Sequence, residues 1–198
     1  MNIKYTATAI LLLIVLFPAG AFGERLGIEL NANTSDLEGK IDVRVPNYEA
    51  DIFLGAGGLY NEDNYFIANG NCFIRDEVFS PALTLGIGFK ALVGEVEISD
   101  IDYDLASMNF ALFGRYDFRE NYYDMPFSVE VGVSGATKPL CFNDTERYID
   151  CSGTVYGHIV HNAAILVGGR YLNLRFDRGA GEVKTKEYAI FFGCKLFI

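Results

Sequence analysis

The sequence feature that most constrains this chain is a hydrophobic period of two residues, which runs from about residue 24 to the C-terminus. Between residues 127 and 134, every second residue is Phe or Val, and the residues between them are Ser, Glu or Gly. Residues 83–90 and 187–198 alternate in the same way. Successive side chains of a strand point to opposite faces, whereas a helix repeats every 3.6 residues. The pattern therefore predicts an all-β protein.

Turn residues divide the alternating part into strands. Clusters of Asn, Asp, Gly and Pro separate ten segments, and no linker or low-complexity tract interrupts them, so we expect one domain over residues 24–198. The ten strands are expected at about residues 25–33, 38–45, 49–60, 64–74, 82–97, 104–118, 126–136, 147–160, 163–177 and 184–198.

The lengths and faces of these strands favour a membrane barrel. Several segments reach or exceed the ~9–11 residues that a tilted strand needs to cross a bilayer. One face is aliphatic and aromatic, and the other mixes Gly, Ser and Thr with charges of both signs. A soluble β-sandwich also alternates, but the glycine-rich polar face and the aromatic residues at strand ends favour a lumen and an interfacial girdle. We expect a closed antiparallel transmembrane β-barrel of ten strands, with eight strands as the alternative.

The N-terminal segment is typical of a secretory signal peptide. Lys4 supplies the positive charge, residues 9–17 are all apolar, and Ala21 and Gly23 fit a cleavage site after residue 23. The apolar run is shorter than the ~20 residues of a spanning helix. We therefore expect residues 1–23 to be removed and the rest to enter the outer membrane. The net charge of −10 excludes nucleic-acid binding through phosphate neutralisation.

Strand parity predicts an orientation in that membrane. With ten strands and both termini on the periplasmic side, the outer loops fall at residues 34–37, 61–63, 98–103, 137–146 and 178–183. These outer loops are rich in Asp and Glu.

Three stretches of the chain resemble the YfaZ family of small Gram-negative outer-membrane proteins. They are residues 83–90 (LTLGIGFK), 139–148 (PLCFNDTERY) and 168–174 (GGRYLNL). The resemblance extends from about residue 26 to the end and implies a closed antiparallel barrel in the outer membrane. It supplies no catalytic residue, because no molecular activity is defined for the family. One departure is the last residue, Ile198, where outer-membrane strands usually end in an aromatic residue.

The alternation places eight charged or titratable residues on the lumen side. Arg115 and Glu130 lie symmetrically about the turn at residues 119–125 and should face each other across one hairpin. One interpretation is a charged constriction that selects solutes. The other, which we favour, is a plug of salt bridges, because barrels of eight to ten strands hold little more than side chains. The predicted lumen set is Lys90, Arg115, Asp117, Glu130, Asp150, His158, Arg170 and Lys195.

His158 is the candidate for a catalytic base in a lipid-modifying barrel. Ser152 shares its face but lies six residues away, about 20 Å along a strand. Ser128 or Ser134 could approach from a neighbouring strand, although nothing in the sequence requires it. A nucleophile and its base must lie within hydrogen-bond reach, so we assign no catalytic residue.

The acidic run Asp100, Asp102 and Asp104 invites comparison with a calcium loop. An EF-hand would need Gly at its sixth position and Glu at its twelfth, where this chain has Leu105 and Ala111. We expect no metal site and interpret the run as an acidic outer loop, either solvated or bridged to lipopolysaccharide by divalent ions.

The chain has four cysteines. Cys141 and Cys151 flank a nine-residue segment in the longest expected outer loop, where the oxidising periplasm favours a disulfide. Cys72 and Cys194 fall on the apolar face and are expected to act as small hydrophobic residues.

The leading hypothesis is a non-enzymatic integral outer-membrane protein with a structural or surface-interaction role and no cofactor. The alternatives are a narrow pore for ions or small solutes through a charged lumen, and a lipid-modifying enzyme that uses His158. Expected partners are outer-membrane lipids, lipopolysaccharide and, during biogenesis, the outer-membrane insertion machinery. The oligomeric state is left open.

Overall fold

The computed structural model describes residues 26–48, 50–62, 65–99, 101–120, 125–177 and 181–198. The expected signal peptide and Asp100 lie outside the described residues. Within them the elements are β1 (Leu26–Ala32), β2 (Asp36–Val45), β3 (Asp51–Asn61), β4 (Tyr65–Glu77), β5 (Leu83–Ile98), β6 (Ile101–Asp117), the 3-10 turn η1 (Phe118–Glu120), β7 (Phe127–Thr137), β8 (Cys141–Asn143), β9 (Thr145–Val160), β10 (Ala163–Asp177) and β11 (Glu182–Phe197). No described helix is long and apolar enough to cross a membrane.

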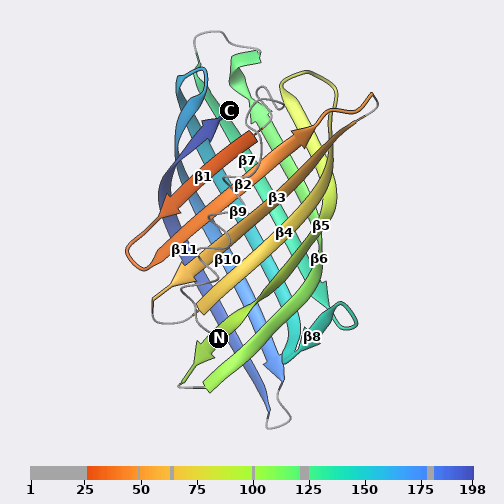
Figure 1. Ribbon diagram of the computed structural model, residues 1–198, viewed down its shortest axis with the longest axis vertical. Helices are drawn as coiled ribbons and strands as arrows, with labels where there is room; N and C mark the ends of the chain where they lie inside the picture. The colour runs from red at the N-terminus through yellow and green to blue at the C-terminus, as the bar shows by residue number, and fades with distance from the viewer. Residues whose placement is uncertain (1–25, 49, 63–64, 100, 121–124, 178–180) are drawn as a thin grey trace.

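The strands form one closed antiparallel barrel (Figure 1). The hydrogen-bonded order is β5-β4-β3-β2-β1-β11-β10-β9-β7-β6, and β5 also pairs with β6, which closes the ring at ten strands. The three-residue strand β8 lies outside this count and pairs with β6 beyond the end of β7. The sequence prediction of a ten-stranded closed barrel is confirmed, and the bounds differ from the prediction by three residues at most.

Alternation along each strand separates an apolar outer face from the lumen. On β5, β6 and β11, outward residues such as Ile87, Phe110 and Ile190 are 60%, 58% and 70% exposed. Inward neighbours such as Leu105 are almost fully buried. The described strands provide no second sheet to cover the outer face. A soluble sandwich would bury these apolar rows between two sheets, so that alternative is wrong.

The lumen is packed with side chains. A buried apolar cluster lies at the end that carries the turns after β3, β5 and β10. It consists of Leu59, Tyr65, Ile67, Leu92, Val96, Tyr103, Leu105, Tyr148, Leu172, Leu174 and Phe176. We call this set the apolar plug. The expectation of an inner face made of Gly, Ser, Thr and charges is wrong at this end, where large aliphatic and aromatic side chains pack against one another. A smaller cluster of Tyr156, Ala164, Leu166 and Phe191 lies inside nearer the other end.

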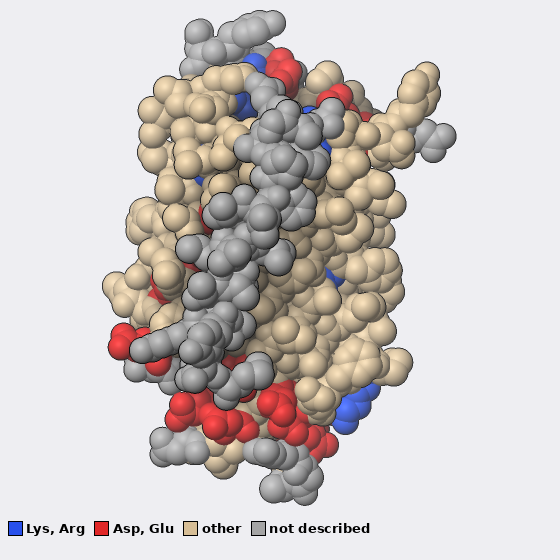
Figure 2. All heavy atoms as spheres, in the orientation of Figure 1, with Lys and Arg blue, Asp and Glu red and all other residues tan. Residues whose placement is uncertain are grey.

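The two ends of the barrel differ in charge. Acidic side chains gather at one end of the molecule in the view of Figure 2, below a wall with few charges. The predicted orientation would make this the outer end. At the opposite end the first and last strands meet, where Leu26 and Ile198 exchange two backbone hydrogen bonds of 3.0 and 2.8 Å.

The seam between β1 and β11 is only partly closed. β1 pairs with β11 from Phe192 to Phe197, whereas β11 itself begins at Glu182. Residues 182–191 therefore pair with β10 on one side and have no partner among the described strands on the other. Figure 1 shows the reason: the β1–β2 hairpin ends midway along the wall, while the β10–β11 hairpin continues to the lower end.

The expected disulfide is not formed, since Cys141 and Cys151 are both free thiols. Cys141 lies opposite Ser107, whose side chain is buried in the lumen. Cys151 lies opposite Val133, which is on the exposed outer face. The wall of the barrel separates the two sulfur atoms, and a spacing of ten residues in the sequence cannot reveal that difference.

Candidate functional site

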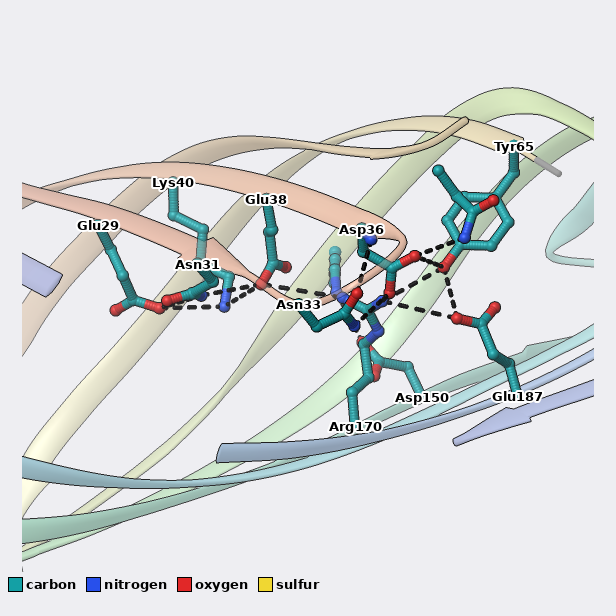
Figure 3. A network of polar contacts seen from close by, with 12 residues as sticks. Glu29, Asn31, Asn33, Asp36, Glu38, Lys40, Tyr65, Asp150, Arg170 and Glu187 are labelled. Carbon is teal, nitrogen blue, oxygen red and sulfur yellow. Dashed lines mark hydrogen bonds and ion pairs between the residues drawn. The ribbon is translucent and has the colours of Figure 1, made fainter. Parts of the chain in front are cut away.

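The polar lumen contains a network centred on Arg170 (Figure 3). Its Nη2 atom lies 2.8 Å from Asp36 Oδ2, and the two side chains are 7% and 5% exposed. Arg170 lies on β10 and Asp36 on β2, which are not neighbours in the sheet, so this ion pair crosses the interior. Tyr65 joins them by donating to Glu187 at 2.7 Å and accepting from Arg170 at 3.3 Å.

Besides the ion pair, the Asp36 carboxylate accepts hydrogen bonds from two asparagine side chains. Asn61 donates to its Oδ1 at 2.6 Å and Asn33 donates to its Oδ2 at 3.0 Å. The pair also has further acidic neighbours, because Glu38 and Glu187 each lie 3.9 Å from the Arg170 guanidinium. One cation thus lies within 4.0 Å of three carboxylates.

A second row of charges crosses the seam. Glu29 on β1 lies directly opposite Lys40 on β2 and Lys195 on β11. Its carboxylate lies 3.2 Å from Lys40 Nζ and 3.6 Å from Lys195 Nζ. Tyr156 donates to Glu29 at 3.0 Å, and Lys195 also reaches Asp42 at 2.9 Å. This row joins the first and last strands of the barrel inside the lumen.

Lys90 and Asp150 form a third cross-lumen contact of 2.7 Å. Lys90 lies on β5 and Asp150 on β9, with β6 and β7 between them in the wall. Asn109 on β6 donates to the carbonyl oxygen of Lys90 at 3.0 Å, so the backbone beside this ion pair is also tied to the neighbouring strand.

At the end where the termini meet, the predicted Arg115–Glu130 pair takes a different form. The two residues lie opposite each other in register, but their charged groups are not within 4.0 Å. Arg115 instead lies 3.6 Å from Asp117 and donates to Ser128 at 3.2 Å. Asp117 in turn lies 2.6 Å from Arg119, a residue of η1.

His158 lies beside Ser128 in this group. Ser128 Oγ and His158 Nε2 are 3.2 Å apart, which is the reach that a nucleophile and its base require. However, Ser128 is fully buried, so no substrate reaches its hydroxyl. The other ring nitrogen, His158 Nδ1, is buried without a hydrogen-bond partner in the described structure, so the third group of a catalytic triad is missing there. The arrangement does not support catalysis.

Several of these residues line one polar cavity of about 310 Å³ inside the barrel. The wall of this cavity brings together five members of the predicted lumen set: Lys90, Arg115, Glu130, Asp150 and Lys195. A larger cavity of about 940 Å³ lies at the open part of the seam, where its wall includes both inward and outward residues of β11, such as Glu187 and Tyr188.

Much of the network was not predicted from the sequence, namely Glu29, Asp36, Glu38, Lys40, Asp42, Tyr65 and Glu187. The sequence did contain a signal for part of it, because Glu29 and Asn31 alternate with Ile28 and Leu30.

Arg75 was also not predicted to lie in the lumen. Its guanidinium carbon lies 3.7 Å from the ring centre of Phe113 and 4.1 Å from that of Phe53, so aromatic faces surround a cation inside the lumen.

The described residues of the predicted acidic outer loop lie in a strand of the wall. Asp102 and Asp104 lie on β6, opposite Glu97 and Glu95 of β5. Asp144 Oδ2 accepts from the backbone N–H of Asp104 at 3.2 Å. Within the described residues, no group of three or more His, Cys, Asp or Glu side chains could hold a metal ion.

No family model and no curated protein matches the sequence, so the resemblance to the YfaZ family stays an expectation. Among solved structures, the chain is similar to one titled "KdgM porin", with a TM-score of 0.47 and 10% identity over 87% of this chain and 98% of that one. It is also similar to "OmpT (in-vitro folded), an outer membrane protein of Vibrio cholerae", with a TM-score of 0.32 and 9% identity over 88% and 95% of the two chains. The strand register alone establishes that this chain is a closed ten-stranded antiparallel barrel.

Proposed function

We propose that the chain is an integral outer-membrane protein with a sealed lumen. In this proposal residues 1–23 direct its export, and the mature protein has a structural or surface-interaction role and no enzymatic activity. The apolar outer face supports membrane insertion, because closure satisfies the backbone of paired strands while the exposed Ile, Leu, Val and Phe side chains suit lipid tails. The acidic end then faces outward, where its loops meet lipopolysaccharide and solvent.

The observation that carries the sealed lumen is the apolar plug. Leu105, Tyr148 and Phe176 have exposures of 1%, 2% and 0%. Tyr103 and Phe176 pack with their ring centres 5.1 Å apart. Ions and polar solutes lose their hydration in such a region at a cost of several kcal/mol. The plug therefore supports a barrier to diffusion rather than a channel.

Single-channel recording in planar bilayers tests this proposal. We expect the wild-type protein to give a flat trace. The double variant Y103A/F176A removes two facing rings from the plug and should give conductance steps, whereas F110A removes a ring from the outer face and should not. Discrete steps from the wild-type protein would refute the sealed lumen.

A narrow pore is the second candidate, and the charged cavity of about 310 Å³ favours it. In this alternative the plug moves aside, and Glu130 in the cavity wall takes part in ion selection. The wild-type protein would then conduct, and E130Q would change the ratio of cation to anion permeability. The same recordings separate the two functions.

Membrane insertion has its own test, which does not depend on conductance. Folded membrane barrels stay compact in dodecyl sulfate until they are boiled. We expect heat-modifiable migration on a gel and recovery of the protein with the detergent-solubilised outer membrane. Recovery in the periplasmic extract, with the same migration before and after boiling, would refute the proposal.

A further inference from the structure

We propose that a row of cations on the outer face of β9, β10 and β11 binds the phosphate of an outer-leaflet lipid. The row lies at the acidic end of the barrel. This inference rests on the membrane location proposed above. The row consists of Arg147, Arg175, Lys184 and Lys186, and we call it the cationic row.

Register places these cations side by side. Lys184 lies directly opposite Arg175, and Arg175 lies directly opposite Arg147. Neighbouring strands are about 4.8 Å apart, so three positive charges line up over about 10 Å of the wall. Lys186 follows on the same face of β11, two residues further from the turn.

The side chains of the cationic row point away from the lumen. On β10, Leu174 and Phe176 belong to the buried apolar plug, so Arg175 between them projects outward. On β11, Val183 packs against the plug, which directs Lys184 to the outer face. Tyr148 does the same for Arg147 on β9.

Ion pairs within the protein balance only part of the positive charge in the row. Glu182 is shared between two cations, at 3.5 Å from Arg175 and 3.4 Å from Lys184. Neither Arg147 nor Lys186 has an ion pair within 4.0 Å among the described residues. Like charges directly opposite each other destabilise a sheet. An anion bound from outside would relieve that repulsion, and a phosphate has the charge and the acceptor oxygens to do so.

The wall next to the row carries aromatic and then apolar side chains, in the order that suits a lipid headgroup and its acyl chains. Beside the cations on the side away from the turn, the rings of Tyr171 and Tyr188 pack with their centres 4.7 Å apart. Tyr side chains are enriched at the headgroup level of membranes. Further along β11 come Ile190 and Phe192, which are 70% and 66% exposed and suit acyl chains.

The wall on the far side of β9 from the row indicates why an anionic lipid would select this place. Thr145 of β9 donates to the backbone carbonyl oxygen of Asp104 on β6 at 3.2 Å, and the outer face of β5 and β6 carries Glu95, Glu97, Asp102 and Asp104. An anionic headgroup is repelled from those two strands and attracted to the cationic row. The acidic side of a second copy is the competing occupant of the row, and the experiment distinguishes it from a lipid.

The test is lipid binding by the mature chain in detergent, followed by native mass spectrometry. The probe is diphosphoryl lipid A, with dephosphorylated lipid A as its matched control. The variants are R147Q, K186Q and R147Q/K186Q. The control variant is R44Q, because Arg44 is a 51% exposed cation paired with Asp51 near the other end of the barrel.

We expect R147Q and K186Q each to weaken binding of diphosphoryl lipid A about fivefold, since a basic residue near an anionic surface contributes about 1 kcal/mol. The double variant should lose about 25-fold if the two cations act independently. R44Q should bind like the wild type, and the dephosphorylated lipid should bind no better to the wild type than to the double variant.

Equal binding of the two lipids by the wild-type protein would overturn the proposal. So would a loss in R44Q as large as that in the double variant, or conversion of a wild-type oligomer to monomers by R147Q/K186Q without a change in lipid binding. Binding is measured in detergent, so these outcomes are separate from a failure of membrane insertion, which the heat-modifiable gel reports for the same samples.

Discussion

The ion pair between Arg170 and Asp36 gives the most stringent test of the packed lumen. We expect R170Q to destabilise the barrel strongly, because it leaves carboxylates buried without their cation. Removing one partner of a buried ion pair costs about 3–5 kcal/mol. The value should lie near the lower end, about 3 kcal/mol, since Asp36 keeps its hydrogen bonds from Asn33 and Asn61.

D36N removes the other charge and should cost less than R170Q. Arg170 still has Glu38 and Glu187 within 3.9 Å, so its guanidinium is not left alone. The double variant D36N/R170Q should be more stable than the sum of the two single losses predicts. We expect a coupling free energy of about 2 kcal/mol, within the range seen for residues that share a buried network.

The chain contains no Trp, so intrinsic tryptophan fluorescence cannot report unfolding. The fraction of fast-migrating folded barrel, read from gels across a urea titration in micelles, supplies the free energy of unfolding for all four proteins. The matched control is R44Q, whose ion pair with Asp51 is exposed and should contribute less than about 1 kcal/mol. Additive losses within about 0.5 kcal/mol would show that Arg170 and Asp36 are not coupled, which would refute the cross-lumen ion pair.

Two further predictions concern the wall. L30C should form a disulfide with the native Cys194 on mild oxidation, because Leu30 and Cys194 are direct partners across the seam and such pairs lie ~5.5 Å apart at Cα. The control L37C has no Cys opposite it and should stay reduced. A gel shift in L37C alone would contradict the register. G88A should destabilise the barrel by about 1–3 kcal/mol, because its Cβ would overlap a carbonyl oxygen of the neighbouring strand. G58A has no atom within 4 Å of the new methyl group, and urea titration should find it close to wild type; an equal loss in the two variants would count against the packing argument.

The architecture could be predicted from the sequence because it depends on local alternation. Leu83, Leu85, Ile87 and Phe89 identify an outer face without any knowledge of neighbouring strands. Parity then assigns Lys90 and Asp150 to the lumen. Closure follows from the number and length of the strands.

The partners inside the lumen could not be predicted in the same way. Arg170 and Asp36 are 134 residues apart in sequence and meet only because β10 and β2 face each other across the lumen. The apolar plug was missed for a related reason. Arg170 was assigned to the lumen, and the same alternation points Leu172, Leu174 and Phe176 inward, but the expectation of a polar inner face gave no reason to look for apolar residues there. The side of the wall on which Cys141 lies depends on β8, a strand too short to leave a periodic signal.

The short pairing of β1 also bears on how the barrel assembles. β11 is joined to β10 from Glu182 to Leu196, but to β1 only from Phe192 to Phe197. The chain ends that meet there are the most distant in sequence, and their encounter carries the largest loop-closure entropy of any strand pair. We therefore expect the pairing of β1 with β11 to form last during assembly and to open first. Amide protons of β1 should then exchange with solvent deuterium before those of β9 and β10, and equal protection of all three strands would show that the junction of the two termini is no weaker than the rest of the wall.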